Sequence, residues 1–137
     1  MVHRLVENGS AGLRILASVL NSSLRLPPQT DGNGNNLAEC AVFLDGFSWG
    51  AVRIADVGLA SQTAGSIPIQ VIGDYSFPTV PASCSGTGPT AKNTVQGLSA
   101  SGILGVGPFL QDCGPGCPGA ALAGPSTTRP QGRGQPV

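Results

Sequence analysis

The sequence predicts a mainly β fold with at most one or two short helices. Gly contributes 21 and Pro 12 of the 137 residues, and this content favours many turns and short strands over long helices. Aromatic residues make up only 4% of the chain, so we expect a core built mainly from Val, Ile, Leu and Ala. The length fits a single domain with a modest core.

Two apolar stretches in the middle of the chain indicate a β-hairpin. Residues 40–44, CAVFL, and residues 50–60, GAVRIADVGLA, flank the segment DGFSW. Asp45 and Gly46 in this segment are typical of a tight turn. We therefore expect the two flanking stretches to pair as antiparallel strands.

A third strand is predicted at residues 66–74, SIPIQVIGD. Ile67, Ile69 and Val71 alternate with less apolar residues, which is the pattern of a half-buried strand. Because Pro cannot donate a backbone hydrogen bond, Pro68 indicates a sheet edge or the start of a strand.

The chain is expected to divide into a lobe at residues 1–117 and a disordered tail at residues 118–137. The tail consists largely of Pro, Gly, Ala, Ser, Thr and Arg and contains almost no large apolar residue. Such a segment cannot compensate for the entropy that it would lose on ordering. Within the lobe, residues 29–39 and 73–94 are predicted to be polar loops.

The charge balance argues against two classes of partner, nucleic acids and anionic membrane surfaces. Seven Lys and Arg residues balance seven Asp and Glu residues. The chain therefore lacks the basic field that attracts nucleic acid or anionic membrane surfaces, and we expect neither partner. No stretch approaches the ~20 apolar residues of a membrane span. The favoured interpretation includes no metal and no cofactor.

The four cysteines predict two disulfides and an oxidising compartment. Three pairings of Cys40, Cys84, Cys113 and Cys117 are possible. The ring between the last two is short and rich in turn residues, so we favour Cys113 with Cys117 and Cys40 with Cys84. The second pair closes a long loop and should contribute ~4 kcal/mol. A zinc site is the rival interpretation, but only one pair of thiols is clustered as such sites require.

Export is expected although the chain begins without an export signal. Residues 1–10, MVHRLVENGS, contain no apolar segment of the length that a signal peptide needs. We therefore expect the chain to be a piece of a longer exported bacterial protein, periplasmic or extracellular. The alternative is a cytosolic protein with four free thiols.

The segment HRLVENGSAGLRILAS, residues 3–18, allows two interpretations. Taken alone, Ser10 is a good helix N-cap, and the apolar residues after it recur with helical spacing through Leu20. In that interpretation Glu7 is a solvated charge just before an amphipathic helix.

The second interpretation depends on a segment far along the chain. VENGS, Val6–Ser10, and ILG, Ile103–Gly105, resemble in order and spacing two elements of one lobe of pepsin-like and retropepsin-like aspartic peptidases. In those families a strand ends in an Asp-Thr-Gly turn, and a later strand with two apolar residues and a Gly passes beneath it. The resemblance implies a β-barrel lobe, incomplete at its N-terminus, with Glu7 in the catalytic position. It further implies an active-site turn and a supporting strand, made by Gly9 and Ser10 and by Ile103, Leu104 and Gly105.

The hairpin between these segments resembles the flap that covers the substrate in such peptidases. The residues that this resemblance assigns to the flap are Asp45, Gly46, Phe47 and Trp49. The run from Glu7 to Cys117 also looks like a bacterial family of unknown function that carries the motif Asp-Thr-Gly-Ser-x-Gly-Leu-Arg. In this chain the motif reads ENGSAGLR and ends at Arg14.

The sequence departs from the peptidase pattern at positions that matter for catalysis. Glu7 is one methylene longer than Asp, Asn8 replaces the Thr, and the flap has no Tyr. No second Asp-Thr-Gly or Asp-Ser-Gly sequence supplies a partner carboxylate. A catalytic pair could therefore come only from a homodimer or from a missing second lobe.

Three functions remain open on the sequence. The favoured one is a catalytically inactive aspartic-peptidase-like domain that is part of a longer chain. The second is a retropepsin-like homodimeric peptidase that uses Glu7 on peptide substrates. The third is a small secreted β-rich module with a binding or structural role.

Overall fold

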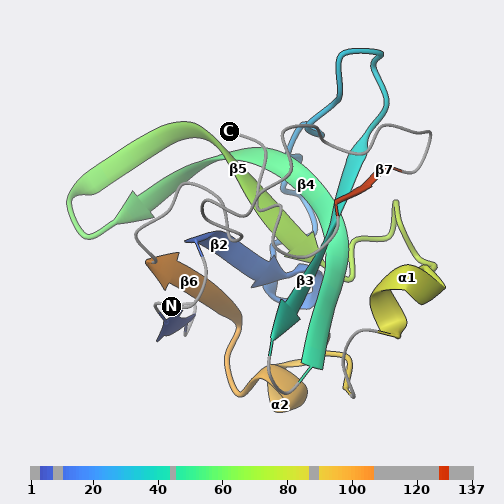
Figure 1. Cartoon of the computed structure of the whole chain (residues 1–137). Helices are drawn as coiled ribbons and strands as arrows, with labels where there is room; N and C mark the ends of the chain where they lie inside the picture. The colour runs from blue at the N-terminus through green and yellow to red at the C-terminus, as the bar shows by residue number, and fades with distance from the viewer. Residues whose placement is uncertain (1–3, 8–10, 44–45, 87–89, 107–126, 130–137) are drawn as a thin grey trace.

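The structure is a computed structural model that describes residues 4–7, 11–43, 46–86, 90–106 and 127–129. In these residues seven strands form one curled sheet in the order β1-β6-β2-β5-β4-β3-β7 (Figure 1). The strands are β1 (Arg4–Glu7), β2 (Ala11–Leu16), β3 (Leu37–Phe43), β4 (Gly46–Leu59), β5 (Gln62–Ile72), β6 (Gly102–Val106) and β7 (Thr127–Arg129). The helical elements are the 3₁₀ turn η1 (Ala17–Val19) and the short helices α1 (Ala82–Ser85) and α2 (Val95–Leu98). The predicted mainly β class is confirmed.

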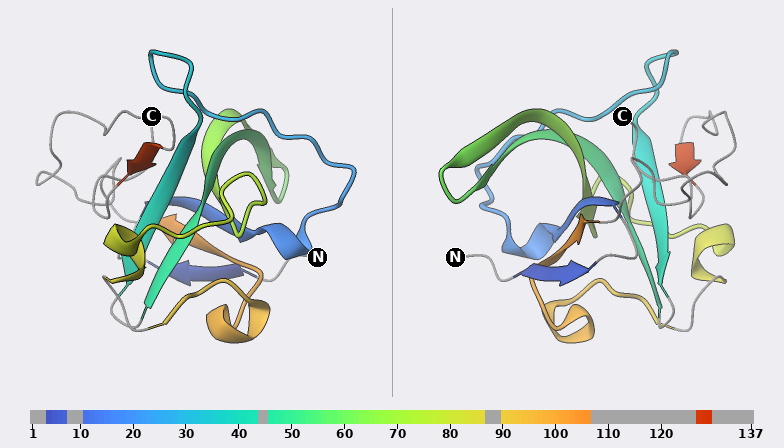
Figure 2. Two further views of the ribbon diagram at one scale, coloured as in Figure 1. Left: turned by 90° about the vertical axis from the view of Figure 1, so that its right-hand side faces the viewer. Right: turned by 60° about the vertical axis from the view of Figure 1, so that its left-hand side comes forward.

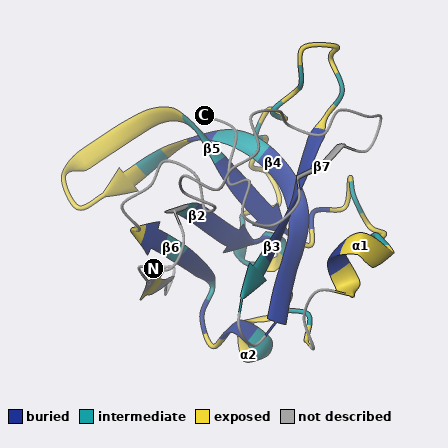
Figure 3. Cartoon of the chain, viewed as in Figure 1, coloured by how far each residue is buried: buried dark blue, intermediate teal, exposed yellow. Residues whose placement is uncertain are grey.

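The longest element is the hairpin of β4 and β5, which contain 14 and 11 residues. Its ladder runs from Gly50 opposite Ile72 to Leu59 opposite Gln62, with a bulge after Ala55. The two strands curl together, so that the sheet bends like part of a barrel (Figure 2). The base of the hairpin is buried and its outer end is exposed (Figure 3). The base therefore belongs to the core.

The place of Pro68 in β5 agrees with the expectation for a strand proline. Pro68 pairs with Ile54 on β4, whereas β2 pairs with β5 only from Gln70 to Ile72. In the described residues β5 therefore has one neighbouring strand at the proline and two neighbours further on. The missing N–H of Pro68 consequently removes no bond from a central ladder.

The first half of the segment that could have been a helix forms strand β2. Its side chains alternate: Leu13 and Ile15 pack in one apolar cluster with Val71, whereas Leu16 packs in another with Ile72. Because β2 lies between β6 and β5, its backbone is paired on both sides and its two faces are buried. The helical interpretation of this segment is wrong except for the single turn of η1.

The predicted central hairpin is formed by β3 and β4, which close with Phe43 opposite Gly46. Asp45 lies outside the described residues. The second strand starts at Gly46, four residues before the predicted strand, because Phe47 and Trp49 are drawn into the core as strand residues.

Part of the predicted tail has a position in the sheet. Thr127–Arg129 form β7, which runs parallel to β3 from Leu37 to Glu39. The remainder of residues 118–137 lies outside the described part of the chain.

Gly50 offers a sharp test of the packing between β4 and β5. A Cβ atom at this position would lie 1.9 Å from the carbonyl oxygen of Val71. Because backbone on the neighbouring strand cannot move aside cheaply, Gly50→Ala should lower the free energy of unfolding by about 3 kcal/mol. Gly58→Ala is the matched control on the same strand, since its nearest neighbour is the Gln62 carbonyl oxygen at 3.9 Å. Urea unfolding of both variants checks this, and equal midpoints would contradict the close approach.

Candidate functional site

Strand β6 lies between β1 and β2, two strands that follow each other directly along the chain. It runs parallel to β1, with Val6 opposite Leu104 and Glu7 opposite Gly105. It runs antiparallel to β2, with Gly105 opposite Gly12. The structure thus brings together the two segments on which the sequence interpretation rested.

Glu7 is the last residue of β1, and β2 begins at Ala11. Across the sheet, Glu7 on β1 lies opposite Gly105 on β6, and Gly105 lies opposite Gly12 on β2. Neither of these two neighbours carries a side chain. Gly12 has a φ of 96°, a left-handed conformation that favours glycine. Gly9 and Ser10 of the predicted turn lie outside the described residues.

The supporting strand β6 is held by apolar side chains and by a close backbone contact. Ile103 is buried with Leu16 and Leu98, and Leu104 packs against the cluster on the other face. A Cβ atom on Gly102 would lie 2.4 Å from the carbonyl oxygen of Arg14. The glycine therefore allows β6 to approach β2 closely.

Of the residues assigned to a flap, Gly46, Phe47 and Trp49 lie on β4, whereas Asp45 lies outside the described residues. Phe47 and Trp49 are 7% and 5% exposed and share a cluster with Cys40 and Cys84. The indole Nε1 of Trp49 donates to the carbonyl oxygen of Phe77 at 3.1 Å. Both rings are thus packed against the body of the sheet in this structure.

The expected disulfide between Cys40 and Cys84 is present and ties β3 to α1. Both cysteines are buried. Cys113 and Cys117 lie outside the described residues, so their pairing stays a prediction.

A family model for proteins of unknown function, DUF3443, matches residues 1–126. The chain belongs to the DUF3443 family. The match includes residues 8–10 between β1 and β2, the β3–β4 and β4–β5 hairpins and β6. No curated protein and no solved structure matches the chain.

A buried polar row crosses four strands of the DUF3443 sheet and was not anticipated from the sequence. Arg14 on β2 donates from Nη2 to Oε1 of Glu39 on β3 at 3.2 Å. Gln70 on β5 donates to the carbonyl oxygen of Glu39 at 2.8 Å and accepts from Ser48 on β4 at 2.9 Å. All four residues are at most 1% exposed. The only sequence signal was a charged residue inside each of two strongly apolar stretches.

A second ion pair joins β4 to the turn after β5. Arg53 donates from Nε and Nη2 to the two carboxylate oxygens of Asp74, which lies 21 residues further along the chain. Asp74 also accepts from the backbone N–H and the hydroxyl of Ser76. Arg53 stands alone among apolar residues in GAVRIA, a pattern that indicates a partner for the charge.

The environment of this pair shifts the pKa of each group in the direction that favours its charged form. Burial of the Asp74 carboxylate acts to raise its pKa, but hydrogen bonds from Arg53 and Ser76 outweigh burial, so the pKa lies below its usual value. The hydrogen bond to Asp74 raises the pKa of Arg53. Both groups are therefore ionised at neutral pH.

The lowered pKa of Asp74 predicts a specific loss of stability in acid. A carboxyl group whose pKa is lower in the folded state stabilises the protein above its unfolded pKa of about 3.9, and this contribution is lost as the pH falls through the folded pKa. We expect Asp74→Asn to cost about 2 kcal/mol at neutral pH. The difference from the wild type should shrink below about pH 4. Urea midpoints between acid and neutral pH measure this, and a difference that does not change with pH would contradict it.

The described residues contain no group of three or more His, Cys, Asp or Glu side chains that could hold a metal ion. In this part of the chain no helix has the length and apolar character required to cross a membrane.

Proposed function

We propose that this DUF3443 chain is one lobe of an aspartic-peptidase-like fold in which Glu7 takes the place of the catalytic carboxylate, and that it does not cleave peptides. The observation that supports the proposal is the insertion of β6 between β1 and β2, with Glu7 opposite Gly105. This is the arrangement implied by the resemblance: a strand ending in the active-site turn, and a later Ile-Leu-Gly strand running beneath it.

The chemistry of such a site explains why a single lobe is inactive. Two carboxylates about 3 Å apart cannot both ionise, and the pair that shares one proton activates the attacking water. One lobe supplies one of these carboxylates. Glu7 also extends further from the backbone than Asp, and a misplacement of about 1 Å can reduce the rate by about 10²-fold. Asn8 further replaces the Thr hydroxyl that joins the facing loops.

A peptidase assay with variants at residue 7 tests the proposal. The purified chain, Glu7→Gln and Glu7→Asp are incubated with an unfolded protein at acid and neutral pH, and the products are identified by mass spectrometry. We expect no cleavage by the wild type, and none by Glu7→Asp even where sedimentation shows a dimer. Cleavage that Glu7→Gln abolishes and Glu7→Asp increases would overturn the proposal in favour of a homodimeric peptidase.

We further propose that the protein is bacterial and is exported to an oxidising compartment. The disulfide between Cys40 and Cys84 supports this location, since such bonds are rare in reducing compartments. Alkylation of free thiols in freshly lysed source cells, followed by intact mass measurement, tests it. Retention of the disulfide is expected, and alkylation at both Cys40 and Cys84 would contradict export.

A further inference from the structure

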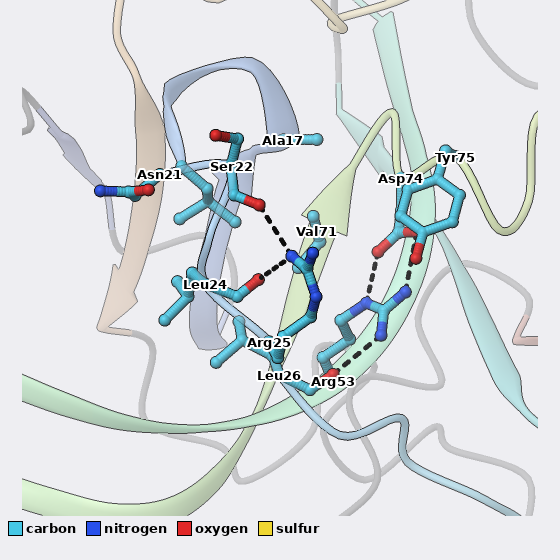
Figure 4. A pocket seen from close by; sticks show the side chains of 11 residues that line it. Ala17, Asn21, Ser22, Leu24, Arg25, Leu26, Arg53, Val71, Asp74 and Tyr75 are labelled. Atoms are coloured by element: carbon cyan, nitrogen blue, oxygen red, sulfur yellow. Dashed lines mark hydrogen bonds and ion pairs between the residues drawn. The ribbon is translucent and has the colours of Figure 1, made fainter.

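A cavity of about 300 Å³ lies between the segment after β2, the middle of β4 and the C-terminal end of β5 (Figure 4). Its walls are largely aliphatic and come from Ala17, Leu20, Leu24, Leu26 and Val71. Its volume is at the lower end of the range for small-molecule sites, which are mostly apolar with a few polar groups that orient the ligand. The size and lining thus suit a small ligand with an aliphatic part.

One polar wall of this cavity is electrically balanced. Arg53 and Asp74 face each other there and form the two-bonded ion pair described above. Arg53 also donates from Nη1 to the carbonyl oxygen of Leu26 at 2.8 Å. Because the two opposite charges compensate each other, this wall contributes shape more than net charge.

The second polar group, Arg25, is a cation held by backbone carbonyls. Its Nη1 donates to the carbonyl oxygens of Ser22 at 2.7 Å and Leu24 at 3.3 Å. No carboxylate of the described residues forms an ion pair with Arg25. The dashed lines in Figure 4 show its guanidinium bonded to this backbone rather than to an acidic side chain. The cavity lining therefore carries one excess positive charge beside aliphatic walls.

We propose that this cavity binds a monoanion in which a carboxylate is attached to an aliphatic group. The Arg25 guanidinium takes the carboxylate, because its planar donors fit two carboxylate oxygens and its positive charge is not matched by an acid in the lining. The aliphatic group fills the space against Leu20, Leu26 and Val71. This chemistry occurs in free aliphatic acids and at the C-terminal residue of a peptide. No residue of β1 or β6 lines the cavity, so the proposal does not depend on the role of Glu7.

Calorimetric titration of the whole chain with four probes tests the proposal. Octanoate represents a free aliphatic acid and N-acetyl-leucine represents a peptide C-terminus. Octanol and N-acetyl-leucine amide are their uncharged counterparts. We expect at least one of the two acids to bind and its uncharged counterpart to bind about 10-fold more weakly or worse. Binding of octanoate alone assigns a free acid, and binding of N-acetyl-leucine alone assigns a peptide end. Binding of both supports the shared chemistry.

Variants of Arg25 and Leu24 separate the roles of charge and apolar surface. Arg25→Gln should weaken binding of the acid about 10- to 100-fold, and Arg25→Lys should lie between it and the wild type. Leu24→Ser should weaken binding while its salt dependence is kept. Arg25 and Leu24 are exposed, so urea midpoints should stay close to that of the wild type, which shows that the variants fold.

Three results would overturn this assignment. The first is a dissociation constant above about 1 mM for all four probes with the wild type. The second is equal binding of an acid and its uncharged counterpart. The third is unchanged binding of the acid to a folded Arg25→Gln variant.

Discussion

Replacing Glu39 with Gln is expected to lower the free energy of unfolding by about 3 kcal/mol. Glu39 and Arg14 are 1% and 0% exposed, and their side chains meet at 3.2 Å. The amide keeps the shape of the side chain but removes the negative charge that faces the guanidinium. A buried charge that loses its counter-charge is far more costly than the intact pair, because water cannot replace the lost partner.

A double-mutant cycle distinguishes the ion pair from simple packing. Arg14→Met, Glu39→Leu and the double variant are compared by urea unfolding. Each single change should be costly, whereas the double variant should lose less than the sum, because no charge of the pair then remains buried. Strictly additive losses, or a Glu39→Gln variant within about 0.5 kcal/mol of the wild type, would show that the pair is not coupled.

Loss of the Cys40–Cys84 disulfide is expected to cost about 4 kcal/mol. The bond spans 44 residues and thereby restricts a large loop of the unfolded chain. The bond also joins α1 to β3 within the apolar cluster that contains Phe47 and Trp49. Its removal should therefore loosen the packing around Trp49, the single Trp of the chain.

The other two cysteines would confuse a simple reduction experiment. The test therefore uses a background in which Cys113 and Cys117 are both Ser, so that reductant acts on Cys40–Cys84 alone. Reductant should lower the urea midpoint of this background and change the emission of Trp49. It should have no effect once Cys40 and Cys84 are also replaced. Identical midpoints with and without reductant in the background would contradict the predicted contribution.

Local sequence patterns predicted much of the fold. Alternating apolar residues predicted a strand at residues 66–74, which overlaps β5 (Gln62–Ile72), and turn residues predicted the β3–β4 hairpin. Pro68 was predicted to mark a sheet edge or the start of a strand, and within the described residues it pairs with a strand on one side. The spacing of apolar residues did not distinguish a helix from a buried strand at Ala11–Leu16, because it fits both. The neighbouring strands β5 and β6 decide the outcome, and neither is close to β2 in the sequence.

The candidate sites were predictable to different degrees. The contact between β1 and β6 could be proposed only through a family resemblance, because almost a hundred residues separate Glu7 from Gly105. The cavity beside Arg25 was not anticipated at all. Its lining combines a 3₁₀ turn, an irregular segment, the middle of β4 and the end of β5, and no periodic pattern links them.

The sequence by itself determined the mainly β class, most strand positions and the composition of the core, because turn residues and side-chain alternation act between near neighbours. It also restricted the disulfide pairing to three possibilities. The tertiary structure alone decided which charges meet. Arg14 on β2 reaches Glu39 on β3 because the sheet curls, although β5 and β4 lie between these two strands. Arg53 reaches Asp74 because the β4–β5 hairpin returns the chain to β4. In the low-polarity interior each charge requires a partner of opposite charge. The sequence shows that a charged residue within an apolar stretch needs such a partner, but it does not show which residue the partner is.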